Sequence, residues 1–226
     1  MQVASSLKIF VIIAITSFFT VFSAEKAVAI QNNENVKGAV EILAFGDSLT
    51  AGYGLPAGDG FTDQLEVWLT EKLGKTVKVT NGGVSGDTSS GGRSRLDWSL
   101  APFKNGRPDL VILELGANDA LRGVQPEVTR ENMDAMMKSL SDKGIKVLLA
   151  GMLATPSWGP EYGRAFDTIY PDMAKKYNAD FYPFFLDGVA ADQSLNQSDG
   201  LHPTKEGVAI IIEKIGPYVI EALSHD

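Results

Sequence analysis

The chain has 226 residues, a formal net charge of −8 and no cysteine. The acidic balance argues against a nucleic-acid partner, because binding to phosphate backbones needs clustered Lys and Arg, and no basic run follows the N-terminal segment. The absence of cysteine excludes thiol nucleophiles, disulfides and Cys-ligated zinc.

The N-terminal segment has the pattern of an export signal. Lys8 precedes an apolar run from Ile9 to Ala24, and small-residue cleavage sites follow near residues 23 and 29. The alternative is an N-terminal membrane anchor, but this run of 16 residues is short against the roughly 20 that a spanning helix needs. We therefore expect residues 1–29 to be a signal peptide and N-terminal arm, with no stable membrane span after its removal.

The rest of the chain alternates strand-length apolar runs with segments of helical period, over a length that suits one domain at 38–226. Five strands are predicted: Val40 to Phe45, Thr76 to Thr80, Asp109 to Leu115, Lys146 to Gly151 and Asp180 to Phe184. Helices are expected over 61–73, around the Met133 to Leu140 stripe, over 160–177 with an interruption at Pro171, and after Thr204 with a bend at Pro217. This alternation predicts a three-layer α/β/α sandwich around a five-stranded parallel sheet.

Polar clusters follow the predicted strands. Gly46-Asp47-Ser48 follows the first strand, residues 82–88 the second and Gly116-Ala-Asn118-Asp119 the third, while Asp199-Gly-Leu-His202 follows the last strand after a loop. Carboxyl ends of parallel strands share one edge of a sheet, where ligands collect. Each cluster alone is typical of an ordinary turn or helix cap.

Together, the clusters supply what acyl transfer requires. The reaction needs a hydroxyl nucleophile, an imidazole base, a carboxylate that orients it and donors for the oxyanion. His202 is the expected base, because the other histidine, His225, lies at a chain end that usually frays. Asp199 is three residues from His202, within reach across one tight turn. The order Ser, Asp, His matches the α/β-hydrolases, but their Gly-x-Ser-x-Gly elbow is absent around Ser48.

Four ordered motifs, "FGDSLTAGYG", "VSGDTSSGG", "LGAND" and "DGLHP", resemble those of the SGNH (GDSL) hydrolases over Val40 to Leu223. The branch with bacterial acyl-CoA thioesterases, lysophospholipases and arylesterases is the most similar. The resemblance implies a flavodoxin-like fold, a periplasmic location, no cofactor or metal, and a small acyl ester or thioester as substrate. One departure is the Gly-Ala-Asn-Asp of the third motif, where Gly-Gly-Asn-Asp is frequent.

The resemblance also assigns roles to residues. Ser48 would be the nucleophile, His202 the base and then the acid, and Asp199 the residue that orients the imidazole. The backbone N–H groups of Ser48 and Gly86, with the side-chain amide of Asn118, would form the oxyanion hole. Asp47 is expected to cap the following helix, and Asp87 and Asp119 to brace loops.

The loop after the fourth strand, residues 152–160, is expected to select the substrate. Trp158 and Tyr162, with Leu121 and Thr155, are predicted to line an acyl-chain pocket, although Trp158 could instead pack the loop onto the domain.

Three other functions remain open from the sequence. A carbohydrate O-acetylesterase would use the same chemistry. A metal-dependent phosphoesterase would use Asp47, Asp119, Asp199 and His202 as ligands. A periplasmic lipid or sugar-ester binder would have no catalytic activity.

Overall fold

The computed structural model describes residues 38–225, so the predicted signal peptide and its cleavage sites lie outside the described residues. Within residues 38–225, no helix is both long enough and apolar enough to cross a bilayer.

The described chain forms a five-stranded sheet of order β2-β1-β3-β4-β5, with every adjacent pair parallel. The strands are β1 (Val40–Gly46), β2 (Val77–Gly83), β3 (Leu110–Glu114), β4 (Val147–Ala150) and β5 (Asp180–Tyr182). This order confirms the predicted parallel sheet and places its topological switch point between β1 and β3. Ligands bind at such a point, beyond the carboxyl ends of the strands.

Strand β2 runs to Gly83, three residues past the predicted end at Thr80. The extension is possible because Gly82 has no side chain: a Cβ there would lie 2.8 Å from Leu43 Cδ1 and 2.9 Å from the Ala44 carbonyl oxygen. Close approach between backbones therefore carries the pairing with β1 up to Gly46.

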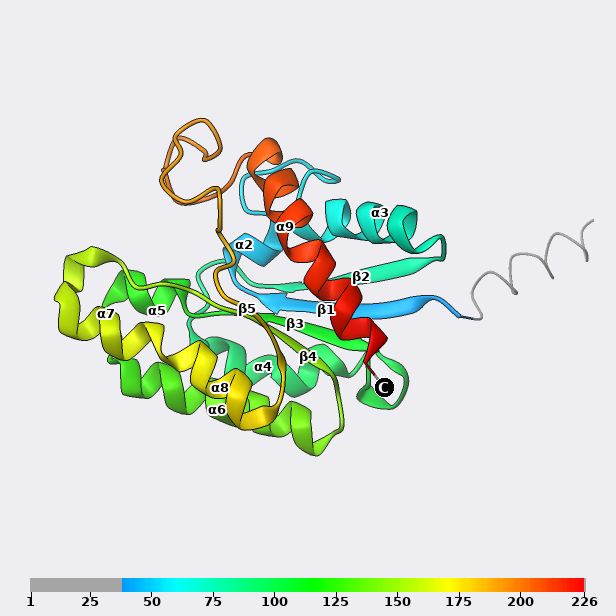
Figure 1. Cartoon of the computed structure of the whole chain (residues 1–226), viewed down its shortest axis with the longest axis horizontal. Helices are drawn as coiled ribbons and strands as arrows, with labels where there is room; N and C mark the ends of the chain where they lie inside the picture. The colour runs from blue at the N-terminus through cyan, green and yellow to red at the C-terminus, as the bar shows by residue number, and fades with distance from the viewer. Residues whose placement is uncertain (1–37, 226) are drawn as a thin grey trace, which may run out of the picture. The chain divides into compact units, whose positions relative to one another are not determined.

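Helices cover both faces of the sheet (Figure 1). On one face lie α3 (Phe61–Leu73) and α9 (Lys205–Ser224), and on the other lie α4 (Ser89–Leu100), α6 (Pro126–Asp142) and α8 (Ile169–Tyr177). The predicted three-layer sandwich is thereby confirmed. Helix α9 continues through Pro217.

The helix predicted over 160–177 is two helices, α7 (Gly159–Asp167) and α8, separated at Thr168. Pro171 stands in the first turn of α8, where its missing N–H would have no partner within the helix. The interruption expected at this proline therefore takes the form of a new helix start.

Helix α4 was not predicted, because its sequence SSGGRSRLDWSL lacks an apolar period and contains two glycines. Its small residues instead allow close contact with the sheet. Gly92 packs directly against Leu115, and a Cβ on Gly92 would collide with that side chain. Tertiary packing therefore overrides weak helix propensity here.

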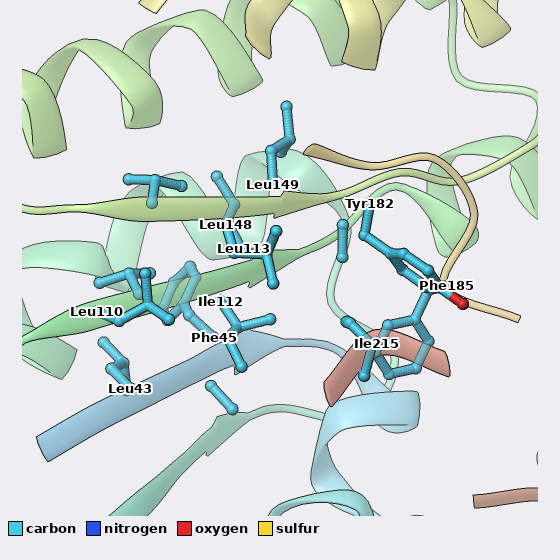
Figure 2. Close-up of a cluster of buried hydrophobic side chains, with 14 of the residues drawn as sticks. Leu43, Phe45, Leu110, Ile112, Leu113, Leu148, Leu149, Tyr182, Phe185 and Ile215 are labelled. Atoms are coloured by element: carbon cyan, nitrogen blue, oxygen red, sulfur yellow. The ribbon is translucent and has the colours of Figure 1, made fainter. Parts of the chain in front are cut away.

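Apolar side chains fill both faces of the central strands (Figure 2). Phe45 and Ile112 are almost completely buried, and Phe185 lies beside Ile215, which α9 contributes to the cluster. Burial on both faces explains why these strands are continuous apolar runs. The packed sheet gives the loops at its carboxyl edge a rigid base.

Candidate active site

A Ser–His–Asp arrangement lies at the carboxyl edge of the sheet. Ser48 is the first residue of the short helix α2 (Ser48–Ala51), directly after β1 and Asp47. Its Oγ lies 2.8 Å from His202 Nε2, and His202 Nδ1 lies 2.6 Å from Asp199 Oδ2. The structure thus brings the three predicted residues into hydrogen-bond contact in the order that nucleophilic catalysis requires.

Asp199 is held by its own turn. Its Oδ1 accepts the backbone N–H groups of Leu201 at 2.9 Å and of His202 at 3.0 Å. The hydrogen bond to the His202 ring, followed by these two N–H bonds, lowers the pKa of Asp199 to about 2. The carboxylate therefore remains charged at neutral pH and holds a proton on Nδ1, which leaves Nε2 free to accept the Ser48 proton.

The predicted oxyanion donors come from separate loops that meet at one cavity. Asn118 lies in α5 (Ala117–Arg122), directly after β3, and Gly86 lies in the loop after β2. Gly86 has φ of 84°, a left-handed conformation that favours glycine. Both residues line the cavity that also contains Ser48 and His202.

The Asn118 side chain has a donor and an acceptor on opposite sides. Its Nδ2 donates to Asp47 Oδ2 at 3.0 Å, and its Oδ1 accepts from Arg122 Nη2 at 3.4 Å. The same Arg122 nitrogen donates to the Gly86 carbonyl oxygen at 2.9 Å. One N–H of the Asn118 amide is therefore used by Asp47, and the second remains for a ligand.

A buried carboxyl group, Glu114, lies beneath the turn that carries Ser48. Its Oε2 accepts from Thr50 Oγ1 at 2.8 Å and from the Asp47 N–H at 3.3 Å. Burial, together with the nearby Asp47 charge, raises the pKa of Glu114 well above its usual range. Burial therefore favours the protonated form of Glu114, whose Oε2 anchors the residues on both sides of Ser48.

Asp47 is also fully buried. Burial raises the pKa of Asp47 to about 6, against the opposing effect of hydrogen bonds from the Leu49 N–H and from Asn118. Asp47 is consequently ionised at pH 7, and its Oδ1 caps α2 through Leu49 as expected.

Sequence reasoning missed the roles of Glu114 and Arg122. The available signal was one acidic residue at the end of an otherwise apolar strand, Leu110–Glu114.

The cavity beside Ser48 has a volume of about 300 Å³. Its lining is mostly apolar and includes Leu49, Leu121, Met152, Leu153, Phe184 and Leu186. Leu121 and Thr155 lie in the lining, as predicted, whereas Trp158 and Tyr162 do not. Such a surface suits a hydrocarbon chain better than a hydroxylated sugar.

Trp158 and Tyr162 instead hold the C-terminal end of α5. Trp158 Nε1 donates to the Ala120 carbonyl oxygen at 2.7 Å, and Tyr162 Oη donates to the Val124 carbonyl oxygen at 2.8 Å. The indole also packs so closely on Gly123 that a Cβ there would lie 2.7 Å from the ring. The expectation of a Trp158 pocket wall is therefore corrected: its N–H finds a backbone acceptor, and the residue packs its loop against α5.

The residues of the metal hypothesis do not converge. Asp119 Oδ1 accepts from the hydroxyls of Ser89 and Thr129, and its Oδ2 accepts the Ser89 N–H at 2.7 Å. Over residues 38–225, no group of three or more His, Asp or Glu side chains is placed to hold a metal ion. Asp119 therefore braces a loop, and Asp87 does the same through its ion pair with Arg95 at 2.6 Å.

The chain is similar to known hydrolases. Residues 44–210 match the model of the GDSL-like Lipase/Acylhydrolase family. Esterase TesA of Pseudomonas aeruginosa is 38% identical over 79% of this chain and 87% of its own. Thioesterase 1/protease 1/lysophospholipase L1 of Escherichia coli is 32% identical over 82% of this chain and 86% of its own. The crystal structure of AlinE4, an SGNH-hydrolase family esterase, is 43% identical with a TM-score of 0.68, over 83% of this chain and 98% of its own.

Proposed function

Because the chain belongs to the GDSL-like lipase/acylhydrolase family, it is an ester hydrolase, and we propose that it cleaves carboxylic esters through an acyl-enzyme on Ser48. The observation that carries this proposal is the continuous hydrogen-bond chain from Ser48 Oγ through His202 to Asp199.

In the acylation step, Ser48 Oγ attacks the ester carbonyl carbon while His202 Nε2 takes the hydroxyl proton. Asp199 stabilises the imidazolium that forms. The carbonyl oxygen becomes an oxyanion, which accepts hydrogen bonds from the backbone N–H groups of Ser48 and Gly86 and from Asn118 Nδ2. His202 then donates its proton to the departing oxygen or sulfur. In deacylation, His202 takes a proton from a water molecule that attacks the acyl carbon, and it returns that proton to Ser48 Oγ as the acid leaves.

The cavity supports an acyl chain as the group transferred to Ser48. Its apolar lining and its volume of about 300 Å³ would bury several methylene groups. Each buried methylene contributes about 0.8 kcal/mol, or about fourfold in kcat/KM. We therefore propose acyl esters, acyl thioesters and lysophospholipids as the substrate class, in preference to sugar acetates.

A p-nitrophenyl ester series from acetate to dodecanoate tests the substrate class. We expect kcat/KM to rise about fourfold per methylene until the cavity is filled, and then to level off. A profile that is highest with acetate would favour the carbohydrate O-acetylesterase alternative.

Fluorophosphonate labelling with peptide mapping tests the reaction itself. The reagent should modify Ser48, and Ser48→Ala and His202→Ala should each lose nearly all turnover. Full activity in Ser48→Ala, or activity that disappears with a chelator, would overturn the serine mechanism.

We also propose that the protein is exported to the periplasm after cleavage near residue 23 or 29. The support is the basic residue, apolar run and small-residue sites of the N-terminal segment. The intact mass of the protein in periplasmic extracts tests this, and a full-length chain retained in membranes would favour the anchor.

A further inference from the structure

We propose that Asp47 and Arg122 are positioning residues that hold the Asn118 amide in the one orientation that can donate to the oxyanion. This inference rests on the proposed function, because it assigns how one oxyanion donor of that reaction is set.

A side-chain amide has two orientations that fill nearly the same space but exchange a donor for an acceptor. With the present orientation, Asn118 directs Nδ2 toward Asp47 Oδ2 at 3.0 Å and Oδ1 toward Arg122 Nη2 at 3.4 Å. The reversed orientation would place Oδ1 against a carboxylate, which can only accept, and Nδ2 against a guanidinium, which can only donate. Asp47 and Arg122 therefore both disfavour the reversed orientation.

The Asp47 contact is the stronger of the two. Both partners of the amide are charged, but the contact to Asp47 is shorter, at 3.0 Å against 3.4 Å, and it is less screened by solvent because Asp47 is buried whereas Arg122 is exposed. Asp47 is itself fixed, because it is fully buried and its Oδ1 caps Leu49 N at 3.0 Å. Its second oxygen, Oδ2, is thereby aimed at Asn118.

Arg122 extends the same constraint to a third loop. Its Nη2 donates to the Gly86 carbonyl oxygen at 2.9 Å as well as to Asn118. The loops after β1, β2 and β3, which carry the three oxyanion donors, are thus joined through Asp47, Asn118 and Arg122.

The sharpest variant is Asp47→Asn. It preserves the shape of the side chain and an oxygen that can cap Leu49, but it presents an amide donor to the Asn118 Nδ2 donor. We expect kcat to fall roughly 10²-fold, the typical cost of one lost oxyanion donor, with little change in KM. If Asp47 acted on the oxyanion only through the repulsion of its negative charge, Asp47→Asn would instead raise kcat.

A double-mutant cycle with Asn118→Ala separates positioning from general support of the turn. Asn118→Ala should lose about 10²- to 10³-fold in kcat, and the double variant Asp47→Asn/Asn118→Ala should lose no more than Asn118→Ala alone. Thr50→Val is the matched control, because it removes a hydroxyl that donates to Glu114 in the same turn without touching Asn118. Its effect on kcat, whatever its size, should multiply with that of Asn118→Ala.

Arg122→Gln tests the same inference without disturbing the buried turn, since Arg122 is exposed. Its longer contact to Asn118 predicts a smaller loss, about three- to tenfold in kcat, which should become smaller in the Asn118→Ala background, where only the hydrogen bond to the Gly86 carbonyl oxygen is left to lose. If Asp47→Asn fails to fold, the Arg122 cycle decides the question alone.

The outcomes distinguish this inference from the function beneath it. Full activity in Asn118→Ala would remove the oxyanion assignment itself. A normal loss in Asn118→Ala combined with wild-type kcat in Asp47→Asn and Arg122→Gln, or with losses that multiply in the double variants, would overturn only the positioning role.

Discussion

Asp47→Asn should change how the stability of the protein depends on pH. Burial raises the pKa of Asp47 from 3.8 to about 6 in the folded state. A raised folded-state pKa means that the stabilising proton is fully bound below the unfolded-state pKa and is lost as pH rises through about 6. Ionised Asp47 therefore lowers the free energy of unfolding at pH 7 relative to pH 4, whereas asparagine does not titrate.

The size of the effect follows from the shift. A rise from 3.8 to about 6 is roughly 2 pKa units, each worth about 1.4 kcal/mol, so the complete change is about 3 kcal/mol. Because part of the unfolded state is already ionised at pH 4, the span from pH 4 to pH 7 should contain about 2 kcal/mol of it.

Urea unfolding of the wild type and Asp47→Asn at several values between pH 4 and pH 7 measures this difference. The variant should gain about 2 kcal/mol relative to the wild type across that span. Most other groups titrate in both proteins and cancel, except Glu114, whose raised pKa depends partly on the Asp47 charge. Repeating the pair in a Glu114→Gln background isolates Asp47, and a difference that does not change with pH would refute a buried, ionised Asp47.

The same substitution is thus expected to abolish the loss of stability between pH 4 and pH 7 and to harm turnover. Opposite effects of one variant are informative, because a general distortion of the turn would reduce both. Retaining a buried charge beside Ser48 is consistent with a functional requirement that opposes folding stability.

Further variants test the rest of the site and its support. Asp199→Asn should keep the turn, since an amide oxygen can still accept the N–H groups of Leu201 and His202. It should lower kcat by about 10⁴-fold, because the imidazole would take the wrong tautomer. Steady-state kinetics with unchanged urea unfolding would show this. Gly46→Ala should lower the free energy of unfolding by about 1–3 kcal/mol, because a Cβ would collide with Glu114; a urea midpoint equal to the wild type would contradict the close packing. Tyr170→Phe should cost about 1–3 kcal/mol by leaving the Leu115 carbonyl oxygen without its 2.8 Å hydrogen bond, measured in the same way.

The elements that sequence reasoning predicted are those with a strong local pattern. The five predicted apolar runs correspond to the five strands, and the Met stripe around Met133 forms part of the buried face of α6. Helix α4 lacked such a pattern, since its stability depends on contacts such as Gly92 against Leu115. The ends of strands were harder to predict for the same reason, because β2 continues beyond Thr80 only where its glycines fit closely against β1.

The position of the candidate site was predictable because topology determines it. Residues that follow parallel strands meet at one edge of the sheet, so Ser48, Asn118 and, after a longer loop, His202 could be grouped from their positions behind predicted strands. The direction of a side chain is a different matter. Trp158 was expected in the cavity wall, but its indole N–H donates to the Ala120 carbonyl oxygen, which turns the side chain onto α5.

Asp47 shows where the local reading of a sequence ends. A helix cap requires one carboxylate oxygen, and the Gly-Asp-Ser pattern was sufficient to predict that bond to the following turn. The partner of the second oxygen depends on which strand lies beside β1. Because the sheet order places β3 there, Asn118 arrives within 3.0 Å of Asp47 from 71 residues further along the chain. A residue that the sequence predicts only as a cap thus becomes, through strand order, a contact of the proposed oxyanion donor.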